Sequence, residues 1–411
     1  MRVLELTHNL PRYPGDFSGT FIDALASAMV AHGAHVHVLA PHDRAYGPAM
    51  QRAYSLSLYR YAWPTSLETV GYMRSLAGDL QPRAVSLLAA PATLLFGAAA
   101  CLREVRRWRP QVIHAHWLLP NGLIGAVVSR LTGVPLAVSL PGSDLLVARL
   151  NPLARWAARF ALDQAALITA NSRELQQVAL ELGADGARFD LIVYGVDPDR
   201  IHRDVEAGTA LRQRLGLEPR AFVVLAVGRM VPKKGFRYLI QAMPALRERV
   251  PVARAVMVGD GDERANLERM ASALGVRAAV HFVGSVPRDE ITAYYSAADA
   301  LAMPSVTEPE DGLNVCVLDA MACALPIVST NVAGNPLVVE DGRNGYLVPE
   351  RRPDLLAEAL ARLALDPHDA RRMGLAGRRR VEAEFSWPQL AARYLEHFHR
   401  IGACAPLPAQ G

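Results

Sequence analysis

Short apolar runs alternate with longer segments of helical periodicity along nearly the whole chain. In the first half, the runs expected to form strands are Val3–Thr7, His35–Ala40, Val112–Ala115, Leu136–Leu140, Leu167–Thr169 and Asp190–Val193. The helices expected between them are Thr20–His32, Asn121–Leu131, Leu153–Leu162 and Arg173–Leu182. Strands that alternate with helices in this way predict a doubly wound α/β domain with a parallel sheet.

A second series of the same kind follows residue 220. Its expected strands are Phe222–Val227, Ala255–Val258, Val280–Val283, Ala300–Met303 and Ile327–Ser329. Its expected helices are Phe236–Glu248, Glu263–Leu274, Arg288–Ala297 and Val315–Ala322. The tail Leu355–His399 has a helical pattern with breaks near Pro367 and Trp387. We interpret Tyr194–Arg220, which contains V-D-P-D and a short charged helix, as a link between domains.

The two series predict an α/β protein with two Rossmann-like domains, residues 1–198 and residues 199–385, that face a cleft. A C-terminal helix at about residues 386–402 is expected to pack back on the first domain. Ligands of such sheets bind beyond the carboxyl ends of the strands. The side chains that follow the strands are therefore the first candidates for chemistry.

The composition excludes several classes of protein. The 411 residues are 51% hydrophobic and 20% charged, which is typical of a folded chain of more than one domain. The formal net charge of +4 provides no electrostatic footprint for nucleic acid. The four cysteines lack metal-binding spacing and are expected to be reduced, as in the cytosol. The N-terminus is interpreted as a strand and not as a secretory signal, and the uncharged segment Ala84–Leu102 as a helix of a soluble domain.

The segment Val227–Gly235, V-G-R-M-V-P-K-K-G, carries the strongest local signal. It offers Arg229, Lys233 and Lys234 between an expected strand and an expected helix. Arginine binds phosphate oxygens in pairs and lysine supplies a point charge, so the pattern indicates a diphosphate site. The alternative is a basic loop in solvent. A second string, D-G-L-N-V-C-V-L-D at Asp311–Asp319, favours the diphosphate site when both strings are considered together.

The spacing of the second string leaves its own alternative open. Asp311 would precede the N-terminus of a helix, where free N–H groups favour a carboxylate or a ligand phosphate. Asp319 would lie one to two turns inside that helix. From spacing alone, a capping Asp311 and a solvated Asp319 are at least as well supported as a binding site.

The turn after the first strand contains Gly15 and Gly19 but not G-x-G-x-x-G. The absence of that fingerprint disfavours a nicotinamide-dependent dehydrogenase. The two glycines predict a flexible loop that approaches a phosphate or a sugar closely.

Two D-x-D strings, Asp197–Asp199 and Asp260–Asp262, have the pattern of a magnesium site at a diphosphate. Arg229 and Lys234 would make such a metal redundant, so we predict no metal site.

His114 and His116 end an expected strand, and their spacing places both side chains on one face. A hydrogen-bonded structural role, a substrate-facing role and a metal pair all remain open, although no carboxylate or third histidine lies nearby in the sequence. The string P-G-S-D after a later strand offers Gly142 and Asp144 to the cleft. The same string could instead form a plain turn in which Asp144 caps a helix.

These strings together resemble a known family. Residues 223–349 are similar to the nucleotide-binding domain of the family 4 retaining glycosyltransferases, or glycosyl transferases group 1, which have the GT-B fold. The resemblance rests on V-G-R-M-V-P-K-K-G-F, V-G-D-G, F-V-G-S-V-P, D-G-L-N-V-C-V-L-D-A-M-A-C-A-L-P-I-V-S-T and V-V-E-D-G-R-N-G-Y-L-V-P. The first half is similar in H-A-H-W-L-L-P-N-G, P-G-S-D-L and V-Y-G-V-D-P, so nearly the whole chain is covered.

The resemblance implies roles by position. Arg229 and Lys234 would bind the donor diphosphate and stabilise it as leaving group. Asp311 and Asp319 fall on the two acids of the family's E-x7-E motif, which contact the donor sugar and the nucleotide ribose respectively. Arg229, Lys234 and Asp311 are thus expected to act in catalysis. The other donor-binding residues implied are Gly19, Gly228, Gly259, Val283, Gly284, Val286, Gly312, Leu313, Asn314 and Val315. His116, Gly142 and Asp144 are expected to face the acceptor or the cleft.

The chain departs from the family pattern at several places. Both motif acids are aspartate, which is one methylene shorter than glutamate. Pro141 stands where many members have a histidine beside the reacting sugar. Ala324 and Ala333 replace glycines, which we interpret as a packing matter.

The implied activity is transfer of a sugar, with retention at the anomeric carbon, from a UDP-sugar or GDP-sugar to an acceptor hydroxyl, without a cofactor. The acceptor is expected to be a glycan or a lipid-linked glycan. A cytoplasmic location is expected, with the basic and apolar segment Leu145–Phe160 either at the inner face of the membrane or forming an ordinary solvated helix. Two alternatives remain, a non-catalytic partner that binds nucleotide sugar and a sugar-nucleotide epimerase. No nucleic-acid partner is expected.

Overall fold

The structure is a computed structural model that describes residues 1–47, 50–72, 76–77, 81–82, 84–142, 145, 148–149, 151–307 and 312–403. The chain divides into two compact units. The first comprises Met1–Ile192 and the chain from Trp387 onward, and the second comprises Val193–Ser386. Both are α/β units with a parallel sheet, which confirms the predicted fold class. The boundary lies between residues 192 and 193, compared with 198 and 199 in the prediction.

The first unit contains a seven-stranded sheet in the order β3-β2-β1-β6-β7-β8-β9, in which all neighbours are parallel. Its strands are β1 (Arg2–Leu6), β2 (His35–Pro41), β3 (Ser55–Tyr59), β6 (Val112–His116), β7 (Leu136–Leu140), β8 (Ala165–Ala170) and β9 (Phe189–Leu191). Every residue of β6 and β7 is buried, as expected for strands covered on both faces. The strand order reverses between β1 and β6. A separate two-stranded sheet pairs β4 (Leu76–Ala77) with β5 (Gln81–Pro82).

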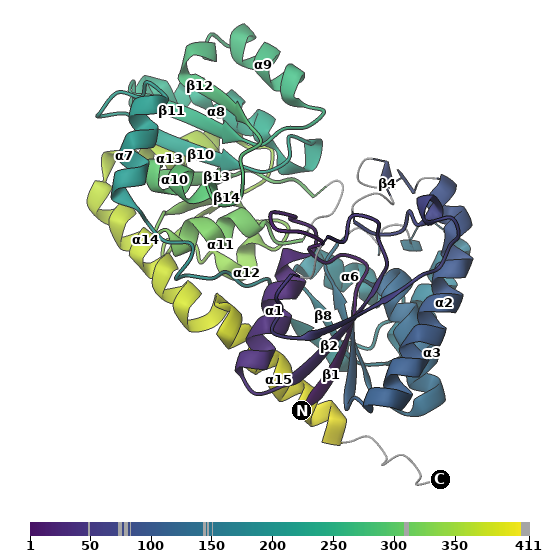
Figure 1. Cartoon of the computed structure of the whole chain (residues 1–411). Coiled ribbons are helices and arrows are strands. Elements are labelled where there is room, and N and C mark those ends of the chain that lie inside the picture. Colours follow the sequence, from purple (N-terminus) through teal and green to yellow (C-terminus); the bar gives the residue numbers. More distant parts are fainter. Residues whose placement is uncertain are drawn as a thin grey trace. The chain divides into compact units, whose positions relative to one another are not determined.

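The helices of the first unit are α1 (Thr20–Ala31), α2 (Ala84–Trp108), α3 (Leu123–Thr132), α5 (Pro152–Gln164), α6 (Arg173–Glu181) and α15 (Trp387–Ala403). Capping hydrogen bonds from nearby side chains fix where some of these helices begin. Asn151 precedes α5 and its side chain accepts hydrogen bonds from the N–H groups of Leu153 and Ala154, at 2.9 and 3.1 Å. The C-terminal helix α15 runs beside α1 (Figure 1). Its Leu390, Tyr394 and Phe398 are buried in the core of this unit.

The second unit contains a six-stranded parallel sheet in the order β12-β11-β10-β13-β14-β15. Its strands are β10 (Phe222–Val227), β11 (Ala253–Val258), β12 (Val280–Gly284), β13 (Ala300–Met303), β14 (Ile327–Thr330) and β15 (Gly345–Val348). The order reverses between β10 and β13, at the same topological position as in the first unit. One continuous apolar core extends from Val193 to Phe385.

The helices of the second unit are α7 (Val205–Arg214), α8 (Phe236–Arg249), α9 (Arg264–Ala273), α10 (Ile291–Ala297), α11 (Val315–Ala322), α12 (Asn335–Val338), α13 (Pro353–Leu365) and α14 (Pro367–Arg380). Asp366 caps α14 by accepting a hydrogen bond from the N–H of Asp369 at 3.0 Å, and Pro367 occupies the first helical position. The predicted breaks near Pro367 and Trp387 are therefore confirmed.

Several short elements of the structure were not predicted, among them β4, β5 and α12. The strands β3 and β15 were not predicted, because each is a short strand at one edge of its sheet and has a weak apolar run. The short charged helix expected in the link segment is α7, as predicted. It packs on α10, and the Arg212 guanidinium donates to the Ala297 carbonyl at 2.7 Å. That part of the segment thus belongs to the body of the second unit.

The uncharged segment from Ala84 lies within helix α2, as expected. Within the part of the chain that the structure describes, no helix has both the length and the apolar character needed to cross a bilayer.

Candidate functional site

Three glycines bring the carboxyl ends of neighbouring strands together in the second unit. Gly228, Gly259 and Gly284 follow or end β10, β11 and β12, and all three have positive φ angles. The Gly228 N–H donates to the Val258 carbonyl at 3.0 Å, and the Gly259 N–H donates to the Gly284 carbonyl at 2.8 Å. A Cβ atom on Gly259 would lie 1.9 Å from the Gly228 carbonyl oxygen. Only glycine permits this close backbone approach.

Cationic side chains line the loop after β10. Arg229 is exposed, and Lys234 is half-buried at the end of a short 3-10 turn, Pro232–Lys234. The Lys234 ammonium donates to the side-chain oxygen of Asn314 at 2.5 Å. Asn314 precedes α11 and donates in turn to Ser305 and Asn335, at 3.0 and 3.1 Å. This network holds the charge of Lys234 beside the start of α11. Lys233, in contrast, is buried.

Asp319 lies in α11 and is almost fully buried, with a side chain that is 1% exposed. Arg288 donates two hydrogen bonds to it, at 2.7 and 3.1 Å, and the Tyr295 hydroxyl donates a third at 3.4 Å. Burial raises the pKa of Asp319, and the Arg288 charge opposes that shift. The alternative in which Asp319 is solvated is therefore wrong. Sequence analysis did not identify Arg288 as its partner, because 31 residues separate them.

The remaining residues implied in donor binding lie at the same edge of the second sheet. Gly312 and Leu313 are buried, and Val283, Val286 and Val315 are half-buried. Asp311, the first motif acid, lies outside the described residues, as does Asp144 in the first unit. Their predicted roles stay predictions.

The two glycines of the first unit differ in their surroundings. Gly19 precedes α1 with φ 65°, and a Cβ on it would lie 2.2 Å from the Asn9 carbonyl oxygen. Its own neighbouring backbone therefore requires a glycine, which is a different reason from the predicted approach to a ligand. Gly142 has open space around its Cβ position and is half-buried after β7.

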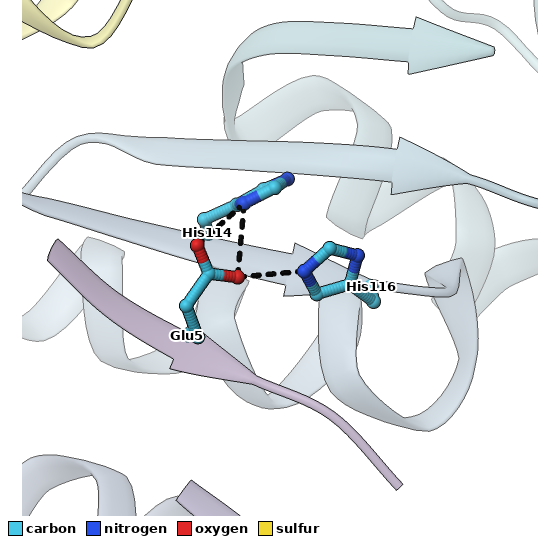
Figure 2. Close-up of side chains that lie close together, drawn as sticks. All are labelled: Glu5, His114 and His116. Carbon is cyan, nitrogen blue, oxygen red and sulfur yellow. Dashed lines mark hydrogen bonds and ion pairs between the residues drawn. The ribbon is translucent and has the colours of Figure 1, made fainter. Parts of the chain in front are cut away.

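His114 and His116 form a cluster with Glu5, a residue that sequence analysis missed (Figure 2). Glu5 lies in β1, which pairs with β6 so that Glu5 is opposite His114. His114 donates through Nδ1 to Glu5 at 3.0 Å, and His116 donates through Nε2 at 2.6 Å. The two rings share one face of the sheet, as predicted. His116 is 2% exposed, which favours the hydrogen-bonded structural role over the predicted position facing the acceptor or the cleft.

The cluster is a buried carboxylate that accepts hydrogen bonds from two imidazoles. Burial alone would raise the pKa of Glu5, but His114 and His116 outweigh burial and lower it to about 2. Burial also lowers the pKa of His116. The far nitrogen of His114 is 2.7 Å from the Ser139 hydroxyl, which also contacts Thr169 and Tyr394 of α15. The network thus joins β1, β6, β7, β8 and α15.

The three side chains also have the composition of a metal site, and their ligand atoms lie within 4.8 Å of one another. Two ligands of a tetrahedral zinc ion would stand roughly 3.3 Å apart, given bonds of about 2.0–2.1 Å. The His116 nitrogen lies only 2.6 Å from the Glu5 oxygen. The observed geometry is that of hydrogen-bonded partners and does not fit a tetrahedral metal centre.

His8 is a further histidine at the carboxyl end of β1. The Asn121 amide nitrogen lies 2.9 Å from His8 Nδ1 and also donates to the His116 carbonyl at 2.7 Å. An amide NH2 can only donate, so His8 accepts at Nδ1 and carries its proton on Nε2. Burial, followed by the nearby His116, lowers the pKa of His8 to about 3. The His8 ring also packs against Trp117, with centroids 4.4 Å apart.

The two alanines that replace family glycines both have left-handed backbones. Ala324 has φ 54° and Ala333 has φ 58°. At the end of α11, the Ala324 N–H donates to Met321 and the Leu325 N–H donates to Ala320, which is the Schellman pattern. The interpretation as a packing matter is therefore wrong, because glycine is favoured there for its backbone freedom.

Comparison with known proteins assigns the chain to a class. A family model described as glycosyl transferases group 1 matches residues 209–380, and a glycosyl transferase 4-like domain matches residues 18–195. The solved structure of Anabaena HepE in complex with UDP superimposes with a TM-score of 0.74, at 21% identity, over 97% of this chain and 100% of that one. The fold is thus the predicted GT-B architecture.

Two curated relatives identify the family. A GDP-mannose-dependent alpha-(1-6)-phosphatidylinositol monomannoside mannosyltransferase of Mycolicibacterium smegmatis is 34% identical over 281 residues, which cover 67% of this chain and 73% of that protein. A 2-deoxystreptamine glucosyltransferase of Streptomyces kanamyceticus is 32% identical over 316 residues, which cover 73% and 80%. The chain belongs to the glycosyl transferases group 1 and is a glycosyltransferase. The comparisons do not favour the non-catalytic or epimerase alternatives.

Proposed function

We propose that the protein transfers a sugar from a nucleoside-diphosphate sugar to an acceptor hydroxyl, with retention at the anomeric carbon. The observation that carries the proposal is the pair of cations after β10, with Lys234 held 2.5 Å from Asn314 and Arg229 exposed in the same loop. The diphosphate gains negative charge as its bond to the sugar breaks. Cations that are already in position stabilise that charge without reorganisation.

Transfer needs neither a metal nor an organic cofactor in this proposal, because Arg229 and Lys234 supply the positive charge. The first carboxylate of each D-x-D string has partners within the protein. Asp197 accepts from the N–H groups of Asp199 and Arg200, at 3.0 and 3.2 Å. Asp260 accepts from the Gly261 N–H at 2.8 Å. Both strings therefore support local turns.

The donor is a GDP-sugar or a UDP-sugar. GDP-mannose is the first to test, because a relative that is 34% identical is named for dependence on it.

The acceptor proposed is a glycan or lipid-linked glycan, reached from the cytoplasmic face of a membrane. Helix α5 supports contact with a lipid surface. Its Leu153 and Trp156 side chains are 76% and 66% exposed, and Trp156 stacks on Phe160. Arg155 and Arg159 are exposed on the same helix. Exposed aromatic and aliphatic side chains flanked by arginines suit an anionic bilayer surface.

The test is sugar release and transfer by the purified protein and its Lys234→Ala variant. Removing one charge that acts on the leaving group is expected to lower kcat about 100- to 1,000-fold. Reactions with GDP-mannose and with UDP-glucose test the donor. Reactions with and without EDTA test the need for a metal, and lipid extract compared with soluble polyols tests the acceptor.

The matched control is Arg237→Ala, since Arg237 is an exposed cation of the adjacent helix α8 and only approaches Glu263, at 4.0 Å. Its turnover should stay within about twofold of the unmodified protein. Equal activity of Lys234→Ala and the unmodified protein, with both folded by circular dichroism, would overturn the diphosphate role.

A further inference from the structure

The loop between β12 and α10 carries an arginine that is placed by a buried acid. Arg288 lies three residues before α10 and reaches across to α11. Its Nη1 donates to one oxygen of Asp319 at 2.7 Å and its Nη2 to the other oxygen at 3.1 Å. Tyr295 donates to the first of these oxygens at 3.4 Å. Both carboxylate oxygens are thus engaged inside the protein.

The two partners differ sharply in exposure. The Asp319 side chain is 1% exposed, whereas the Arg288 side chain is 54% exposed. A guanidinium has five N–H donors, and the described residues take up two of them at Asp319. The polar group that this pair presents to the outside is therefore the guanidinium.

Arg288 lies in the loop after β12. It follows Gly284, at the carboxyl edge of the second sheet, where ligands bind in doubly wound folds. Arg229 and Lys234 lie at the same edge after β10. A third cation there adds to the positive charge available to a nucleotide.

We propose that Arg288 contacts the donor nucleotide by donating N–H groups to its ribose or phosphate oxygens, and that Asp319 is the positioning residue that orients Arg288. This inference rests on the proposed function. It reverses the role implied by the family motif, in which the second acid itself binds the ribose. Aspartate is one methylene shorter than the family's glutamate, and here its two oxygens hold an arginine.

Isothermal titration with UDP and GDP tests the inference. Arg288→Ala is expected to weaken binding of the preferred nucleotide diphosphate about tenfold or more, which is the effect of losing a charge-assisted hydrogen bond. Arg288→Lys should recover part of the loss. If Asp319 were the contact, Arg288→Ala would release its carboxylate and leave binding unchanged or tighter. That result would overturn the inference.

The corresponding nucleoside distinguishes the two kinds of oxygen. A loss for the diphosphate together with an equal loss for the nucleoside assigns the contact to the ribose. A loss for the diphosphate alone assigns it to the phosphates.

A double-mutant cycle covers the case in which Arg288→Ala leaves a buried charge and fails to fold. Arg288→Ala combined with Asp319→Asn removes both charges, and this variant should bind the nucleotide about tenfold or more weakly than the unmodified protein, which is the loss expected for Arg288→Ala. Asp319→Asn alone should weaken binding by misplacing Arg288, so the two losses should not add. Additive losses would assign an independent contact to Asp319 and contradict the proposal.

Lys234→Ala separates this inference from the proposed function. If the unmodified protein binds neither nucleotide, the proposed function fails together with the inference. If Lys234→Ala loses binding while Arg288→Ala keeps it, the proposed function stands and only the role of Arg288 is wrong.

Discussion

The two units share a strand order but differ in chemistry at the place where that order reverses. In the first unit, β1 and β6 carry Glu5, His114 and His116, all buried and bonded to one another (Figure 2). In the second unit, β10 is followed by Gly228 and by an exposed Arg229, and Lys234 is half-buried. One reversal point carries a hydrogen-bonded polar network, and the other is followed by cationic side chains.

The difference follows from the cost of burying charge. A buried carboxylate is tolerated only when hydrogen bonds replace the water it loses, and Glu5 has two imidazole donors for that purpose. Under the proposed function, Arg229 and Lys234 must instead stay accessible to the donor, and they are exposed and half-buried respectively. The first network should therefore govern stability and the second should govern binding.

The largest expected effect is on Glu5. Glu5→Ala leaves two buried imidazoles without an acceptor, so the free energy of unfolding of the first unit should fall by about 3–5 kcal/mol. Urea denaturation followed by tryptophan fluorescence measures this unit alone, because all five tryptophans lie in it. They are Trp63, Trp108, Trp117, Trp156 and Trp387.

Glu181→Ala is the control, since Glu181 is 45% exposed and makes a surface ion pair with Arg149 at 3.4 Å. It should change stability by less than about 1 kcal/mol. Nucleotide binding by folded Glu5→Ala should be unchanged. If Glu5→Ala stayed as stable as the unmodified protein but no longer bound nucleotide, the Glu5 network would act in binding and not in stability.

The next effect is the response of the first unit to acid. The pKa values of His8 and His116 are both lowered by burial, so the unfolded chain binds protons below about pH 6.5 that the folded unit does not. Stability should fall as the pH drops from about 6.5, by up to roughly 1.4 kcal/mol per pH unit for each histidine. Glu5 adds to the loss only below about pH 4.5, as the pH approaches its lowered pKa of about 2.

His8→Phe keeps a ring beside Trp117 and removes one titrating group. Between pH 7 and pH 5, its free energy of unfolding, measured by fluorescence, should fall less steeply with pH than that of the unmodified protein. The difference in slope should approach that of one proton, about 1.4 kcal/mol per pH unit. An identical slope in the two proteins would show that His8 protonates without cost in the folded state.

The smallest effect concerns the end of α11 in the second unit. Ala324→Gly relieves a left-handed alanine, which costs about 1–2 kcal/mol, but glycine also loses more entropy on folding. The free energy of unfolding should rise by about 0.5–1 kcal/mol, measured by thermal unfolding. A sample saturated with nucleotide serves as the reference that identifies the unfolding transition of the second unit. Ala322→Gly, in the right-handed part of the same helix, should lower stability by about 0.5–1 kcal/mol or more. Equal changes in the stability of the two variants would show that the left-handed backbone at Ala324 has no energetic cost.

The sequence by itself determined the alternation of strands and helices, because each element depends on apolar periodicity and caps within a few residues. Asp366 and Pro367 end one helix and begin the next through local bonds alone. The cations after β10 were predicted for the same reason, since a strand, a glycine turn and Arg229 are adjacent in the chain.

Only the tertiary structure decided which distant groups meet. Glu5 and His114 are 109 residues apart and become neighbours through the register of β1 against β6. Arg288 reaches Asp319 because the loop after β12 passes over α11. Gly259 is required by the carbonyl of Gly228 on another strand, and Ala324 shows its left-handed backbone only in the folded helix end. Such contacts depend on strand register and on closure of long loops, for which a short stretch of sequence carries no local signal.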